Sequence, residues 1–252
     1  MYVLKLESRG VACEVSVNDV PLASVTGSAA SNRLAFAAPW ITEPTGIMSA
    51  RILPPPIPPE RPVERSADAV LIALPPGAPA GEPEGEVIAE IRWSAPPGDE
   101  TEVPPLQREA RFSARPAPPM RWQRSRLSAG TPADAEALFA WIVGLQAAVE
   151  RGDVAHFMRA SEPGLRDLAE AMGLDPQEQI EELTELLTLN FPVTGLKPLV
   201  PDDLVYRPVA GGRLLAVTRK NGDPVIATVP DAARPYRYSL RAGMIDGQWW
   251  AF

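Results

Sequence analysis

The 252-residue chain has very little of the two side chains that most often carry out enzyme chemistry, because it contains one cysteine, Cys13, and one histidine, His156. One cysteine excludes an internal disulfide framework and a thiolate-rich zinc site. One histidine excludes histidine-rich metal sites and leaves only His156 for a Ser-His-Asp triad. Cys13 falls in an expected strand without a basic neighbour, and His156 falls in the middle of an expected helix. We therefore interpret both as packing or surface residues.

Several motifs are also missing. The chain has no Gly-x-Ser-x-Gly elbow and no glycine loop followed by Gly-Lys-Ser/Thr, so neither a hydrolase nucleophile nor a phosphate-binding loop is indicated. No apolar run approaches the roughly 20 residues of a membrane-spanning helix, and residues 1–7 alternate like a strand rather than a signal peptide. Asp202 and Asp203 precede an expected strand and point to opposite faces, so we interpret them as solvated turn residues. We expect a cytoplasmic bacterial protein without cofactor or metal.

Proline and helix signals occupy different parts of the chain. Twenty of the thirty prolines precede Ser125, whereas the helix signals lie between Thr131 and Phe191. Because proline is excluded from helix interiors and central strands, the two parts require different architectures. We predict an all-β sandwich or jelly roll over residues 1–112, a Pro/Arg-rich linker over 113–131 in which Trp122 docks against one domain, and an α+β domain over 132–252.

The first part contains short alternating or apolar runs separated by turn residues such as Asn18-Asp19. Many short strands at this spacing are typical of two packed sheets. We interpret the proline cluster at 54–59 as a stiff inter-strand loop rather than a ligand for aromatic-grooved domains. The expected strands are 3–7, 12–17, 33–37, 47–53, 69–74, 86–93 and 109–114.

The second part begins with strong helix boundaries. Thr131 is the expected N-cap of a helix that ends at Gly152. A short helix is expected from Asp153, a third opened by Pro163, and a fourth opened by Asp175. From residue 204 the apolar period changes to two, and Asn-Gly and Asp-Gly pairs supply hairpin turns. We therefore predict helices over 132–191 and an antiparallel meander over 204–252.

Two stretches of this second part carry a family resemblance. Phe139-Ala140-Trp141 with residues 148–157, followed much later by Asp246-Gly247-Gln248-Trp249-Trp250, resembles the ketosteroid-isomerase-like (SnoaL-like) cone fold. The chain departs from that pattern by two extra helices before the sheet. The resemblance implies helices on the concave face of a curved sheet, with a small apolar ligand between them and an isomerase- or cyclase-like activity. By strand parity the ligand-pocket candidates are Tyr206, Tyr238 and Trp250, which otherwise fill the core.

The first part carries a second resemblance. Residues 14–22 with Asn32-Arg33-Leu34 look like pieces of a galactose-binding-type jelly roll. A further hypothesis for this half is a carbohydrate-binding β-sandwich, in which Trp40 or Trp93 would be the stacking platform. No site residues are carried over from that family.

The charge of the chain is segregated. The net charge is −8, residues 132–191 contain twelve acidic and three basic residues, and residues 107–126 contain six arginines and one acid. A net-acidic protein is a poor nucleic-acid binder, since phosphate neutralisation supplies most non-specific affinity. Complementary charge blocks do, however, guide encounters between proteins. We therefore expect no nucleic acid and no membrane as partner, and a protein partner instead.

One acidic stripe stands out on the fourth expected helix. Its glutamates recur every three or four residues, opposite the apolar stripe of Ile180, Leu183 and Leu187, and like charges at that spacing destabilise an isolated helix slightly. The stripe is either a solvated face or a surface for a basic partner, which is the arginine-rich linker or another protein. Our leading hypothesis is a non-catalytic interaction or accessory protein, in one version an immunity-type factor. The partner-binding candidates are Glu178, Glu181, Glu182 and Glu185.

Overall fold

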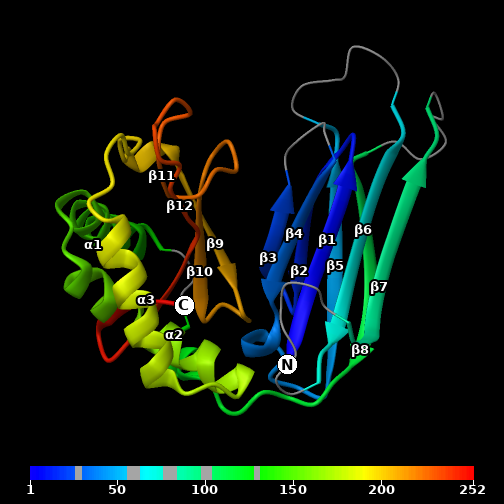
Figure 1. The fold of residues 1–252 in the computed structure, drawn as a ribbon, viewed down its shortest axis with the longest axis horizontal. Coiled ribbons are helices and arrows are strands. Elements are labelled where there is room, and N and C mark those ends of the chain that lie inside the picture. Colours follow the sequence, from blue (N-terminus) through cyan, green and yellow to red (C-terminus); the bar gives the residue numbers. More distant parts are fainter. Residues whose placement is uncertain (26–29, 56–62, 76–83, 98–103, 128–130) are drawn as a thin grey trace. The chain divides into compact units, whose positions relative to one another are not determined.

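The computed structural model describes residues 1–25, 30–55, 63–75, 84–97, 104–127 and 131–252 (Figure 1). Contacts within the chain divide it into two compact units. Unit 1 comprises Met1–Pro118 with Ala171–Gly173, and unit 2 comprises Pro119–Glu170 with Leu174–Phe252. Unit 1 is built from strands, and all three α-helices begin in unit 2, in agreement with the predicted β-rich and α+β halves. The proline clusters at 54–59 and 75–83 lie mostly outside the described residues.

Unit 1 contains two four-stranded antiparallel sheets (Figure 1). All seven expected strands of this half are confirmed, with their ends shifted by a few residues. The first sheet has the order β4 (Ser31–Phe36), β1 (Tyr2–Arg9), β6 (Arg65–Ala73) and β7 (Glu86–Ala95). The second has the order β3 (Val20–Val25), β2 (Ala12–Val17), β5 (Thr45–Leu53) and β8 (Leu106–Ser113).

Buried and more exposed side chains alternate along the strands, and the buried ones of both sheets of unit 1 form one shared core. Leu4 and Leu6 of β1, and Val15 and Val17 of β2, are fully buried in the same cluster. Strand β3 was not expected, because Pro21 lies near its start. β3 is an edge strand, where a missing N–H group costs no hydrogen bond of the sheet.

The helices of unit 2 are α1 (Pro132–Arg151), α2 (Val154–Met172) and α3 (Pro176–Asn190). The predicted caps of α1 are confirmed: Thr131 Oγ1 accepts a hydrogen bond from the Asp134 N–H at 3.2 Å, and Gly152 is left-handed. The predicted break at Pro163 is wrong, because α2 passes through it without ending. The buried stripe of α2 continues on both sides of the proline, and tertiary packing of this kind outweighs the cost of one missing hydrogen bond.

The sheet of unit 2 is not the continuous meander that we predicted. Its strand order is β14 (Gln248–Ala251), β13 (Leu240–Ile245), β10 (Leu214–Arg219) and β9 (Leu204–Val209). β11 (Ile226–Ala227) and β12 (Arg237–Tyr238) pair only with each other, so residues 220–239 leave the sheet between β10 and β13. The Asp246-Gly247 hairpin is confirmed by positive φ at both residues.

The three helices cover one face of this sheet (Figure 1). Leu138, Ile142 and Leu145 of α1 are fully buried in one cluster with Leu215 and Val217 of β10. This helix-on-sheet packing supplies the main core of unit 2.

Candidate functional site

The three aromatic residues that we predicted on one face of a sheet do not share a face: Tyr206 and Trp250 lie on opposite faces of the four-stranded sheet, and Tyr238 lies outside it in β12. Tyr206 stands opposite Val217, and both pack in the helix-facing core. Trp250 stands opposite Gly243, where an added Cβ would lie 2.4 Å from Ser125 Oγ on the other face. The parity prediction failed at Trp250 because the Asp246-Gly247 turn places Trp249, not Trp250, toward the helices.

Tyr238 is part of a packed aromatic cluster beneath α2. Its ring lies 5.0 Å from that of Phe157, Phe157 lies 5.6 Å from Phe191, and Phe191 lies 6.0 Å from Tyr236, all edge to face. The Tyr238 hydroxyl lies 3.4 Å from that of Ser161, and burial raises the pKa of Tyr238. These contacts follow the alternative that we gave for the aromatic set, in which the rings fill the core.

Neither tryptophan that we considered for carbohydrate stacking presents its ring to solvent. Trp40 is 7% exposed and Trp93 is 6% exposed. The Arg65 guanidinium lies 6.0 Å from the centre of the Trp93 ring. A stacking platform needs an exposed ring, so the carbohydrate hypothesis loses the residues on which it depended.

The two nucleophile or base candidates are placed as structural residues. Cys13 is buried, and burial raises the pKa of its thiol to about 12, which keeps it protonated and unreactive. The backbone N–H of His156 donates to Asp153 Oδ1 at 3.0 Å at the start of α2. Asp202 and Asp203 are exposed, as expected for solvated turn residues. Among the residues that the structure describes, no group of three or more His, Cys, Asp or Glu is arranged to hold a metal ion.

The arginine-rich segment is anchored to helices of unit 2, but not to the acidic stripe of α3. Asp167 of α2 accepts hydrogen bonds from the backbone N–H groups of Arg121 and Trp122 at 2.8 and 3.1 Å. The Arg121 guanidinium contacts Asp167 at 3.0 Å and Glu170 at 2.7 Å. Trp122 is 7% exposed, which confirms that it docks against one part of the protein. Arg126 pairs with Asp134 at the start of α1.

The pKa values of the two carboxylates of this cluster, Asp167 and Glu170, shift in opposite directions. Burial raises the pKa of Asp167, although three hydrogen bonds and the charge of Arg121 oppose that rise. Glu170 is more exposed, and its hydrogen bonds with Arg121 lower its pKa. The arginine therefore stabilises both carboxylates, and the cost of desolvation falls on Asp167. We interpret the cluster as a structural anchor.

The acidic stripe lies on the outer side of α3. All four of its glutamates are exposed, and within the described residues none of them pairs with a cation. Gln177 and Gln179 donate side-chain hydrogen bonds to Glu181 and Glu182 at 2.8 and 3.2 Å. Of the two partners that we considered for the stripe, the arginine-rich segment has Arg121, Arg124 and Arg126 paired with other carboxylates.

Two large apolar side chains are exposed on the same helix. Leu186 is 55% exposed and Leu189 is 79% exposed, whereas Leu187 is buried. The spacing places Leu186 four residues after Glu182, and Leu189 four residues after Glu185, so each leucine continues the row of a glutamate. Sequence analysis missed them, although both fall outside the buried stripe of Ile180, Leu183 and Leu187. The outer face of α3 is therefore acidic over its first half and apolar near its end.

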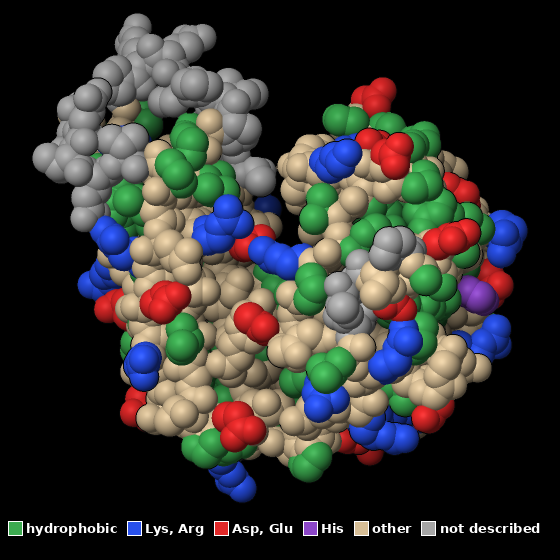
Figure 2. Space-filling view, turned by 180° about the vertical axis from the view of Figure 1, so that it is seen from behind, with side chains coloured by type: hydrophobic (Ala, Val, Ile, Leu, Met, Phe, Trp, Pro, Cys, Tyr) green, Lys and Arg blue, Asp and Glu red, His purple; other side chains and the backbone are tan. Residues whose placement is uncertain are grey.

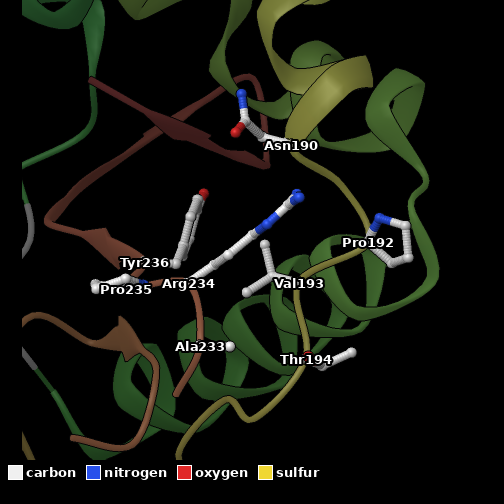
Figure 3. A pocket seen from close by; sticks show the side chains of 8 residues that line it. All are labelled: Asn190, Pro192, Val193, Thr194, Ala233, Arg234, Pro235 and Tyr236. Atoms are coloured by element: carbon white, nitrogen blue, oxygen red, sulfur yellow. The ribbon is translucent and has the colours of Figure 1, made fainter. Parts of the chain in front are cut away.

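A pocket of about 280 Å³ lies beyond the C-terminal end of α3 (Figure 3). It is lined by the segment that follows the helix and by the connection between β11 and β12. Neither segment was singled out by the sequence. The lining residues are Asn190, Pro192, Val193, Thr194, Ala233, Arg234, Pro235 and Tyr236.

No family model, curated protein or solved structure matches this chain. The resemblances to the cone fold and to the jelly roll therefore stay predictions. None of the helices in the described part of the chain combines the length and apolar character needed to cross a membrane. On the face that Figure 2 shows, acidic and basic side chains are interspersed, so recognition by charge has to depend on local groups.

Asp223 provides a pH-dependent contribution to the stability of unit 2. It accepts hydrogen bonds from Lys197 at 2.7 Å, Asn221 at 3.1 Å and Arg237 at 3.1 Å. The hydrogen bond from Lys197 is the main reason that the pKa of Asp223 lies below its ordinary value, and the other donors and cations act in the same direction. A lowered folded-state pKa stabilises the fold fully above the unfolded-state pKa of about 4, and this stabilisation is lost as the pH falls further.

We expect Asp223→Asn to lower the free energy of unfolding by about 1 kcal/mol at pH 7, and this difference to shrink below about pH 4. Urea denaturation of both proteins between pH 7 and pH 3 measures it. Asp231→Asn is the matched control, because Asp231 is exposed and makes no ion pair within the described residues. A difference that grows as the pH falls would contradict the prediction.

Proposed function

We propose that this protein is a non-catalytic interaction protein that binds a basic, amphipathic segment of another protein along the outer face of α3. An accessory or immunity-type factor is one concrete form of that role. The observation that carries the proposal is the combination, on one helix, of two exposed leucines with four exposed glutamates that have no cation partner in the part of the chain that the structure describes. A cytoplasmic location is part of the proposal.

The apolar part of this face argues for a protein partner rather than for solvent alone. A solvated helix face has no need of Leu189, which is 79% exposed. Burial of one leucine side chain contributes about 1.5–3 kcal/mol, so covering Leu186 and Leu189 would supply a substantial part of a micromolar affinity. Hydrophobic contact near the end of α3 thus supplies affinity, and the glutamates supply specificity.

The acidic part defines the chemistry of the partner. Glu178, Glu181, Glu182 and Glu185 repel one another at three- and four-residue spacing, and a cationic partner relieves that repulsion. Charge complementarity raises the association rate and rejects acidic segments. The segment that fits has lysine or arginine residues beside its apolar ones at helical spacing.

A labelled peptide tests this surface directly. We expect a fluorescein-labelled helical peptide of lysine and leucine, with its leucines on one face, to bind the protein more tightly than a scrambled peptide of the same composition. Glu181→Lys/Glu185→Lys should weaken this binding about tenfold or more, because attraction becomes repulsion at two positions. Raising the salt from 0.05 to 0.5 M should weaken wild-type binding as well. Fluorescence anisotropy measures each affinity.

Two further variants separate charge from general damage. Asp202→Lys/Asp203→Lys makes the same change of net charge at exposed positions outside α3, and it should leave the affinity nearly unchanged. Leu186→Ser/Leu189→Ser should weaken binding without altering its salt dependence. Equal affinity for the two peptides, or equal loss from both charge reversals, would contradict the proposed function.

A further inference from the structure

The pocket beyond the C-terminal end of α3 is lined by apolar residues and by the ends of a few polar side chains. Pro192 and Val193 form one side, and Ala233 and Pro235 lie on the other (Figure 3). Its volume of about 280 Å³ is just below the usual range for small-molecule sites. The pocket is therefore large enough for a small molecule with a compact apolar body.

Three polar side chains end around the same space. Figure 3 shows the Arg234 guanidinium and the Tyr236 hydroxyl both extending toward the side where the Asn190 amide lies, with their ends apart. Asn190 Nδ2 already donates to the Leu186 carbonyl at 2.6 Å, which leaves Asn190 Oδ1 as an acceptor. Within the described residues, neither the Arg234 guanidinium nor the Tyr236 hydroxyl makes a hydrogen bond or an ion pair.

These groups select the charge of the ligand. Arg234 offers a permanent positive charge and paired donors that fit the two oxygens of a carboxylate. Burial raises the pKa of Tyr236, so its hydroxyl stays protonated and donates a hydrogen bond. Arg234 is exposed at the pocket, so it would repel a cation and would stay solvated, without a new contact, beside a neutral apolar molecule. We propose that this pocket binds a small carboxylic acid with an apolar body, with its carboxylate on Arg234 and Tyr236.

A structural role for Arg234 is the main competing explanation. A cation near the C-terminal end of α3 complements the helix dipole and so stabilises the helix. One of the last four carbonyls already has a partner, because Leu187 accepts from the Phe191 N–H at 2.8 Å. The dipole explanation gives no role to the Tyr236 hydroxyl, which lines the same pocket, whereas a carboxylate site uses both groups. The two explanations predict different binding results.

Benzoate is a suitable probe, with benzamide as its neutral counterpart of the same shape. We expect benzoate to shift the amide resonances of Val193, Thr194 and Ala233 in ¹H–¹⁵N spectra, and to bind about tenfold or more tightly than benzamide. Arg234→Gln should remove that preference. Tyr236→Phe should weaken the binding of benzoate by a few-fold, because the hydrogen bond from the neutral hydroxyl to the carboxylate is lost.

Arg159→Gln is the matched control, since Arg159 is exposed, belongs to unit 2 and does not line the pocket. It should leave the preference for benzoate intact. Equal binding of benzoate and benzamide, no saturable shift with either probe, or a preference that survives Arg234→Gln would overturn the proposal. A change only in the thermal stability of Arg234→Gln would assign the arginine to the helix dipole instead. None of these outcomes depends on the outer face of α3, so the pocket and the proposed function are tested separately.

Discussion

Replacing Gly164 with alanine is expected to lower the free energy of unfolding by about 2–3 kcal/mol, although alanine is the better helix former. Gly164 lies inside α2, where a Cβ would come within 2.5 Å of the Ala251 carbonyl oxygen and 2.7 Å of Phe252 Cα. Both contacts are with backbone that cannot turn aside as a flexible side chain does. Ala251 is fixed by its pairing with Ala242, and the Phe252 N–H donates to the Arg241 carbonyl at 2.8 Å. The added methyl therefore has to separate α2 from the last strand.

The chain contains a matched control for this substitution. Gly144 also lies inside a long helix, α1, but nothing lies within 4 Å of the position that its Cβ would occupy. Gly144→Ala should therefore stabilise the protein by up to about 1 kcal/mol through helix propensity alone. Urea denaturation of the two variants should give midpoints that move in opposite directions. If both midpoints rise, α2 and the last strand do not approach each other as closely as the structure has them.

Some helix boundaries of this chain could be predicted from the sequence, and others could not. The ends of α1 and the start of α3 were predicted correctly, because Thr131, Gly152 and Asp175 act on their own neighbours. The break predicted at Pro163 was wrong, because the buried stripe that carries α2 through it depends on residues far away in the chain. Local chemistry can be read from the sequence, but the packing that overrides it cannot.

The candidate sites also differ in whether the local sequence is enough to predict them. The acidic stripe of α3 could be predicted from spacing alone, and the exposed leucines beside it could have been, since periodicity places them off the buried face. The pocket could not be predicted, because Arg234 and Asn190 line the same space only when residues 220–239 leave the sheet as a separate hairpin. Strand parity also failed to place Trp250, since a two-residue turn decides which face its strand presents.

Asp167→Ala is expected to destabilise the protein by about 3–4 kcal/mol. Asp167 is 1% exposed and accepts from the Arg121 and Trp122 N–H groups as well as from the Arg121 guanidinium. Its removal leaves two backbone donors without their acceptor in a buried place, and each such loss costs about 1–3 kcal/mol. Glu170 retains its ion pair with Arg121 and limits the damage. Asp167→Asn should cost roughly half as much, because one oxygen still accepts.

An exposed ion pair on the same helix separates burial from charge. Glu162 pairs with Arg166 at 2.8 Å, with both side chains at least one-third exposed, so Glu162→Ala should change stability by no more than about 0.5 kcal/mol. Hydrogen exchange gives a second, local measurement: the amides of Arg121 and Trp122 should lose protection in Asp167→Ala and keep it in Glu162→Ala. Equal effects of the two variants would mean that Asp167 acts only as a surface charge. A large and local loss would instead establish that a single buried carboxylate holds the Arg121–Trp122 part of the segment on α2, away from the acidic stripe of α3.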